Sequence, residues 1–339
     1  MENKSQHTQD FISSVRKQIQ FLAAENHFEL VGFTEAKLPL QDRENIQSFI
    51  ENKFYASMDW FPERQSIRMD FENLGFTVNS CIVLGSVYYP TNESTDAMVQ
   101  WEDRISKYAW GQDYHDVLKN KARPIIEYLR RTFPESKFRQ AVDSLPIPEK
   151  ILARQAGLGW IGKNTLLLNS SLGSYFFLTV ILCENNLLFE SNLENTSDPD
   201  SILGMSKDRC GTCTACIDAC PTQAIVAPYQ LDANLCISHH TIETKGEYTT
   251  DLPTKNWIYG CDICQDVCPW NRVSARKKNV KTQIREYSPL MILEKTKSIQ
   301  DLLAISEEKF IEEFKNSPIL RTGWKNLNRN INHVISNRE

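Results

Sequence analysis

The chain has 339 residues, of which 41% are hydrophobic and 24% are charged, and its formal net charge is -5 at pH 7. These values are ordinary for a soluble globular protein of two or three domains, and they exclude a uniformly basic nucleic-acid-binding protein. No apolar run reaches the roughly 18 residues of a membrane span, and the start (MENKSQHTQDFISS) lacks the apolar core of a signal peptide. We therefore expect a cytoplasmic protein without membrane contact.

Apolar periodicity predicts the elements of the N-terminal part and of the tail. The run at 78–89 (VNSCIVLGSVYY) is the clearest strand, because it is rich in β-branched and aromatic residues and stops at Pro90. Pro124 lies inside a helical pattern and should divide or kink that helix. Helices are expected at residues 1–30, 113–131, 148–156 and from about 286 onward, and strands at 30–33, 78–89, 138–142 and 175–183.

The composition changes twice along the chain. Asn, Ser, Asp and Glu dominate residues 184–208, as in a linker, and a cysteine-rich segment then runs from 210 to 269. We therefore expect three parts: residues 1–185, a ferredoxin-type domain at 200–285, and a helical segment at 286–339.

Eight of the ten cysteines form a duplicated motif. Cys210, Cys213, Cys216 and Cys220 follow the spacing C-x2-C-x2-C-x3-C before Pro221, which is the run of bacterial ferredoxins. In that run the fourth cysteine binds the other of two clusters. We therefore expect one four-iron, four-sulfur cluster on the first three cysteines and Cys268. The other cluster is expected on Cys220, Cys236, Cys261 and Cys264.

Zinc is the alternative metal, because four-cysteine zinc sites also use C-x2-C pairs. A zinc site would not need a crossed fourth cysteine followed by proline, twice, so the pattern favours iron–sulfur clusters and a redox protein. Cys81 and Cys183 lie inside apolar strands and are expected to be buried small side chains rather than ligands.

The 200 or so residues before the motif should hold the destination of the electrons. Asp143 follows a predicted strand, where active-site acids are common. The segment 108–115 (YAWGQDYH) is dense in polar and aromatic side chains. The loop 157–165 (GLGWIGKNT) fits neither dinucleotide nor P-loop spacing. Its glycines suit a backbone that closely surrounds a large planar ligand.

These motifs together resemble the epoxyqueuosine reductase family, over about residues 10–335 and in the family's order. The matching segments are 108–115, 156–165, 210–221, 236–243 and 261–271. The resemblance implies an α+β fold with an N-terminal α/β cobalamin-binding domain, a two-cluster ferredoxin-like domain and a short helical C-terminal segment. It also implies a monomeric cobalamin-dependent oxidoreductase that converts epoxyqueuosine at the wobble position of tRNA anticodons to queuosine. The electron donor is of unknown identity.

The resemblance also assigns residues. It implies that Asp143 is the proton donor and that Arg68, Ser106 and Ser238 lie near cobalamin, with His115 lining the site. Two departures from the family pattern stand out. The chain has Thr179-Val180 where a Gly-Glu pair is expected near cobalamin, and it has few residues after Arg329-Asn330, where many members continue into helical repeats.

Two alternatives belong to other classes. A reductive dehalogenase-like enzyme would use the same cofactors on a halogenated small molecule, and an electron-transfer protein would have the clusters without chemistry. Cobalamin binding separates the second from both enzymes, and tRNA binding separates the enzymes. The stretch 272–285 carries six basic residues and no acid, and is either a solvated loop or a phosphate-contacting edge.

Overall fold

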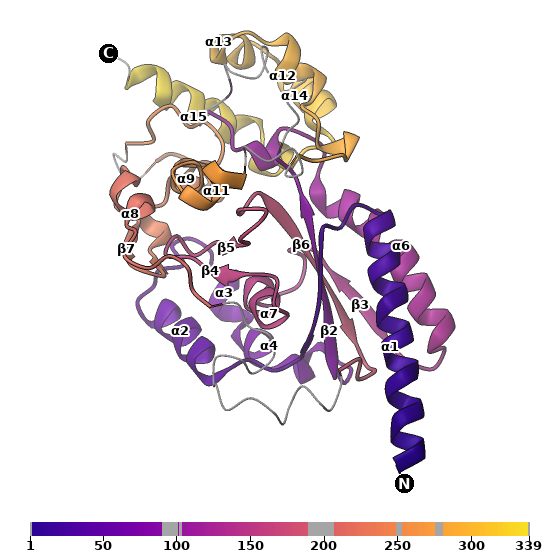
Figure 1. Cartoon of the computed structure of the whole chain (residues 1–339). Helices are drawn as coiled ribbons and strands as arrows, with labels where there is room; N and C mark the ends of the chain where they lie inside the picture. Colours follow the sequence, from indigo (N-terminus) through magenta and orange to yellow (C-terminus); the bar gives the residue numbers. More distant parts are fainter. Residues whose placement is uncertain are drawn as a thin grey trace.

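The computed structural model describes residues 2–89, 101, 104–188, 207–248, 253–274 and 281–337. Figure 1 shows a central sheet with helices on both faces, the cysteine-rich segment beside its upper end, and the C-terminal helices at the top. Among the described residues, no helix has the length and apolar character needed to cross a membrane.

The main sheet has four antiparallel strands in the order β1-β2-β6-β3. The two central strands pair over their whole length, and every residue of β2 is buried. Because successive side chains of a strand point to opposite faces, Ile82 and Leu84 enter one core while Cys81 and Val83 enter the other. The strands are β1 (Leu30–Glu35), β2 (Ser80–Val87), β3 (Phe138–Ala141) and β6 (Phe176–Cys183).

Two helices cover each face of this sheet. On one face, α1 and α6 contribute apolar residues such as Ile19 and Leu118. On the other face, α2 and α7 contribute Ile46 and Leu152. The helices of this part are α1 (Glu2–Glu25), α2 (Leu40–Glu51), α3 (Trp60–Glu63), α4 (Gln65–Met69), α6 (Tyr114–Thr132) and α7 (Glu149–Gln155).

The expected helices and strands of the N-terminal part are confirmed, as is the α+β class. Pro124 does not divide α6, which is one helix of 19 residues. Thr179 and Val180 are fully buried in β6 between β2 and β3. They therefore support the sheet and do not border an open site. Cys81 and Cys183 are buried, as predicted, and lie in different cores.

The cysteine-rich segment consists of short elements joined by turns. Its elements are α8 (Ala215–Ala219), β7 (Ile225–Ala227), β8 (Gln230–Leu231), α9 (Ile237–Ile242), α10 (Ile263–Asp266) and α11 (Pro269–Ser274). A two-stranded hairpin of the N-terminal part, β4 (Trp160–Ile161) and β5 (Leu167–Leu168), packs against it through Trp160 and Cys268.

The helical tail is confirmed and packs as one core with residues from the middle of the chain. Leu293, Phe310 and Ile331 join Trp101 and Ile105 in that core. The amide of Asn330 donates to the carbonyls of Thr241 and Ile258, both at 2.8 Å, which ties the tail to α9. The tail comprises α12 (Met291–Lys295), α13 (Ile299–Leu303), α14 (Glu307–Phe314), the 3-10 helix η10 (Pro318–Thr322) and α15 (Trp324–Ser336).

Candidate redox and active site

Electrostatic interactions divide the eight motif cysteines into two sets, although the described residues contain no group of three or more side chains already placed to hold a metal ion. Electrostatic interactions join Cys216 to Cys210 and Cys268, and join Cys268 to Cys213. In the second set, Cys264 interacts with Cys236 and Cys220, and Cys261 interacts with Cys264. We call these the outer set (Cys210, Cys213, Cys216, Cys268) and the inner set (Cys220, Cys236, Cys261, Cys264). They are the groups that the crossed motif leads one to expect, and their role as cluster ligands stays a prediction.

Several sulfur atoms of both sets accept N–H groups. The amide of Ala224 donates to the Cys220 Sγ at 3.2 Å. Backbone N–H groups of Ser238 and His239, at the start of α9, lower the pKa of Cys236 against the effect of its burial. Backbone N–H groups of Trp270 and Asn271 do the same at Cys268. N–H donors stabilise the negative charge of cluster-binding thiolates and tune cluster potentials, so the surroundings fit iron–sulfur clusters.

The loop 157–165 connects the N-terminal part to both sets. The Lys163 ammonium donates to the carbonyls of Gly211 and Cys213 at 2.6 and 3.0 Å. The Asn164 amide donates to the carbonyl of Cys264 at 3.1 Å. At Gly159 the close approach is to the chain itself, because a Cβ there would lie 2.0 Å from the carbonyl oxygen of Leu168. That glycine is needed for the β4–β5 hairpin, and not for a planar ligand.

Asp143 lies just beyond β3 with a φ of 48°, in the left-handed region. Non-glycine residues adopt this conformation at a cost, which Asp tolerates better than most. Two contacts hold the residue there. Its backbone N–H donates to Glu149 Oε1 at 2.8 Å, and its Oδ2 accepts the Tyr114 hydroxyl at 3.0 Å. The Tyr114 ring stacks on Phe177 of β6, with ring centroids 4.2 Å apart.

The residues beside Asp143 combine partial exposure with shifted pKa values. Asp143 and Lys150 are exposed and Glu149 is half-buried. Nevertheless, burial and the charge of Asp143 raise the pKa of Glu149 to about 8, and burial lowers the pKa of Lys150. Lys150 also interacts with Cys264, so the surroundings of Asp143 adjoin the inner cysteine set.

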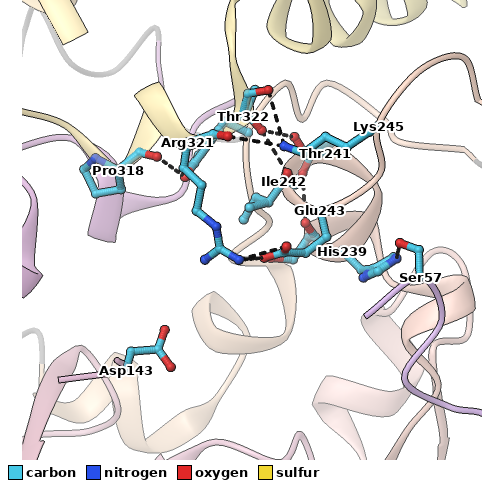
Figure 2. A network of polar contacts seen from close by, with 12 residues as sticks. Ser57, Asp143, His239, Thr241, Ile242, Glu243, Lys245, Pro318, Arg321 and Thr322 are labelled. Carbon is cyan, nitrogen blue, oxygen red and sulfur yellow. Dashed lines mark hydrogen bonds and ion pairs between the residues drawn. The ribbon is translucent and has the colours of Figure 1, made fainter. Parts of the chain in front are cut away.

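The C-terminal part also contributes a residue to the site, Arg321. The Arg321 guanidinium, on η10, donates to both carboxylate oxygens of Glu243 at 2.6 and 2.8 Å. Figure 2 shows this side chain extending from η10 to the side of the site where Asp143 lies. Although burial opposes it, the charges of Glu243 and Asp143 raise the pKa of Arg321. The site is thus enclosed by residues from distant parts of the sequence.

Two buried polar side chains, His239 and Arg68, have polar groups that are available to a ligand. The Nε2 of His239 lies 3.1 Å from the Ser57 hydroxyl, but its buried Nδ1 has no hydrogen-bond partner among the described residues (Figure 2). Burial and His240 lower the pKa of His239 to about 4, so the ring is neutral. Arg68 donates to the Phe61 carbonyl at 2.9 Å and has no carboxylate partner in the described ranges. Both side chains could bind a polar or anionic ligand.

The remaining predicted residues lie near the site with different surroundings. Ser106 is buried, its N–H donates to the Tyr259 carbonyl at 2.9 Å, and its hydroxyl interacts with Asp262. Ser238 is half-buried in α9 beside Cys236. The His115 ring stacks on Tyr114 and its Nδ1 lies 2.6 Å from Asp113 Oδ1.

Sequence reasoning missed Tyr114, Glu149, Lys150 and Arg321. Tyr114 stands inside a motif that was singled out, and Glu149 follows Asp143 by six positions. A search for acids near Asp143 could therefore have found Glu149. Arg321 carries no local signal, because only the fold brings it to this site.

Comparisons with known proteins agree with this geometry. Residues 209–271 match the family model described as a 4Fe-4S double cluster binding domain. Residues 68–144 match the model described as epoxyqueuosine reductase QueG, DUF1730. The first match covers all eight motif cysteines and favours iron–sulfur clusters over zinc.

Two curated relatives that match nearly the whole chain are both named epoxyqueuosine reductase. An epoxyqueuosine reductase of Cyclobacterium marinum is 36% identical over 96% of this chain and 99% of its own length. The Escherichia coli epoxyqueuosine reductase is 34% identical over 96% of this chain and 82% of its own length. A crystal structure of epoxyqueuosine reductase with an epoxyqueuosine-modified tRNA-Tyr stem loop is 27% identical, with a TM-score of 0.81 over 96% of this chain and 82% of that one.

Proposed function

Because this chain belongs to the epoxyqueuosine reductase family, we propose that it reduces epoxyqueuosine in tRNA anticodons to queuosine. The observation that carries the proposal is the position of Asp143. Its neighbour Lys150 interacts both with Asp143 and with Cys264 of the inner cysteine set. A proton donor and an electron source therefore meet at one place, as the removal of an epoxide oxygen requires.

The reaction needs two electrons and two protons. Both C–O bonds of the epoxide break, the two ring carbons become an alkene, and the oxygen leaves as water. Bound clusters and a reduced cobalt corrin supply the electrons, since such chemistry belongs to cofactors and not to side chains. The protein must bind the substrate, orient the epoxide and protonate its oxygen.

Asp143 is the proposed general acid. An alkoxide is a poor leaving group, and a positioned acid contributes about 10²- to 10⁴-fold to such a step. The Tyr114 hydroxyl and the Glu149 carboxyl orient Asp143 from its side-chain and backbone ends. Arg321, across the site, adds a positive charge that stabilises the anion left after the proton has been given.

The site residues fit a cobalamin. The Nδ1 of His239, which has no hydrogen-bond partner among the described residues, and the Arg68 guanidinium, which has no carboxylate partner there, offer polar contacts. We propose Arg68 and Ser238, together with Asp143, as cofactor contacts. His115 would act through Tyr114, and Ser106 through Asp262.

The tRNA is the proposed partner and, with it, a cytoplasmic location. Single-stranded anticodon bases are recognised after they leave the stack, while phosphates supply most of the affinity. The basic stretch 272–285 stays a predicted phosphate contact. Its Lys277 and Lys278 lie outside the described residues. We further propose a monomer with three parts, 1–185, 200–285 and 286–339, and a separate protein as electron donor.

One experiment tests the function. The reconstituted protein is incubated anaerobically with cobalamin, a chemical reductant and tRNA that contains epoxyqueuosine, and the nucleosides are analysed by mass spectrometry. Queuosine should appear only when all components are present. Cofactor-loaded protein that leaves epoxyqueuosine unchanged would contradict the proposal.

A further inference from the structure

The backbone of Asp143, the proposed general acid, has an unusual conformation and an unusual hydrogen-bond partner. Asp143 holds its left-handed φ of 48° outside any helix or strand, just after β3 ends. Its peptide N–H points to a side chain, the Glu149 carboxyl, at 2.8 Å. Glu149 is the first residue of α7, whose Leu152 and Ala153 are anchored in the core beneath the sheet. The carboxyl therefore has a rigid base.

We propose that Glu149 is the positioning residue of Asp143: its carboxyl anchors the Asp143 peptide and keeps the acidic side chain in place beside Tyr114 and Lys150. This inference rests on the proposed function and names a further residue on which the reaction depends. Among the described residues, the side chain of Asp143 accepts a hydrogen bond from the Tyr114 hydroxyl alone, so the backbone anchor is the second contact that fixes the loop after β3.

A second carboxyl so near also changes the protonation of the site. Two acids in one enclosed site resist carrying two negative charges. In agreement, burial and Asp143 raise the pKa of Glu149 to about 8. The pair thus keeps one proton at neutral pH, at the place where a proton is consumed.

Other charged groups face this pair from each neighbouring element. Lys150 lies on α7 itself and donates to the Thr165 carbonyl at 2.7 Å. Tyr114 comes from α6 and Arg321 from η10, and both interact with Asp143. These groups are unchanged in substitutions of Glu149, so shifts in the pH profile report on Glu149 and Asp143.

Two substitutions of Glu149 separate the effect of its hydrogen bond to the Asp143 N–H from the effect of its ionisable carboxyl. Glu149→Gln keeps an oxygen that accepts the Asp143 N–H but removes the acid, whereas Glu149→Ala removes both. Glu127→Gln, on the exposed side of α6, is the matched control. Iron content and thermal unfolding of each reconstituted variant show whether it folds.

The first readout is the single-turnover rate against pH, with saturating cobalamin and epoxyqueuosine-containing stem-loop. At pH 6, Glu149→Ala should be slower by about 10- to 100-fold, as for a misplaced acid, and Glu149→Gln should remain within about threefold of wild type. The alkaline limb of the Gln variant should move to lower pH by about one unit or more, because the variant lacks the proton that Glu149 holds up to about pH 8. Equal losses in both variants with an unmoved limb would mean a merely structural role and overturn the proposal.

The second readout needs no substrate, so it stands even if the proposed reaction fails. In the infrared difference spectrum of wild type minus Glu149→Gln, a protonated carboxyl band should be present at pH 7 and disappear with a midpoint of about 8. A spectrum without that band would contradict the shared proton. Failure of wild type to form queuosine would instead contradict the proposed function alone.

Discussion

The outer and inner cysteine sets share one motif but differ in how far solvent reaches them. Only the outer set has an exposed cysteine, Cys213, although its Cys268 is buried, and the four cysteines of the inner set are all half-buried. In the inner set burial raises the pKa of Cys261 and Cys264 far above that of a free thiol. Cys264 interacts with Cys216 on one side and Lys150 on the other. We therefore expect electrons to enter at the outer set and to leave from the inner set.

The largest effect is expected when a substitution removes one of the two clusters, because the path of the electrons is then interrupted. Wild type should bind about eight iron and eight sulfide, and Cys213→Ser and Cys264→Ser about four of each. Cys264→Ser should lose turnover with every reductant. Cys213→Ser should lose turnover with a protein donor but recover it with a small reductant that reaches the inner cluster. Equal behaviour of the two variants would contradict the assigned direction.

Asp143→Asn should slow the formation of queuosine without disturbing either cysteine set. The variant cannot donate a carboxylic proton, so single-turnover formation of queuosine should fall by about 10²- to 10⁴-fold. Cluster content and cobalamin binding should persist, because no cysteine changes and the side-chain volume is nearly the same. A near-normal rate at saturating tRNA and cobalamin would remove Asp143 from catalysis.

These expectations differ in how much the sequence alone supports them. The cysteine groups follow from local spacing, because the geometry of a ferredoxin run lies within a few residues. Asp143 was found through a strand end and a resemblance. Its partners were not found, because Tyr114 and Arg321 reach it only through packing of α6 and η10. The glycines of the loop 157–165 are ambiguous in the sequence. A glycine that lets the backbone approach the chain's own hairpin leaves the same sequence pattern as one that lets it approach a ligand.

The stability of the folded protein should also depend on pH through Glu149. The folded pKa of Glu149, about 8, lies above the ordinary value of 4.5. The native state then binds more protons than the unfolded state between these values. The stabilising effect is complete below about 4.5 and is lost as pH rises through about 8. Thermal unfolding of wild type should weaken over this window more than that of Glu149→Gln. Parallel curves would argue against the raised pKa.

The smallest effect is expected on tRNA affinity. If the basic stretch 272–285 contacts phosphates, replacing Lys277 and Lys278 with Ala should reduce the slope of log affinity against log salt by about one to two. Titrations of an anticodon stem-loop at several salt concentrations measure it. An unchanged slope would assign the stretch to a solvated loop.

The most direct measurement follows the electrons to the product. The cobalamin-loaded protein is reduced, freed of excess reductant, and mixed anaerobically with epoxyqueuosine-containing tRNA. The spectroscopic signal of the reduced clusters and the nucleosides are then recorded over time. The account predicts that queuosine forms as the clusters become oxidised, and that Asp143→Asn retains both reduced clusters and substrate. Queuosine formed while the clusters stay reduced would contradict it.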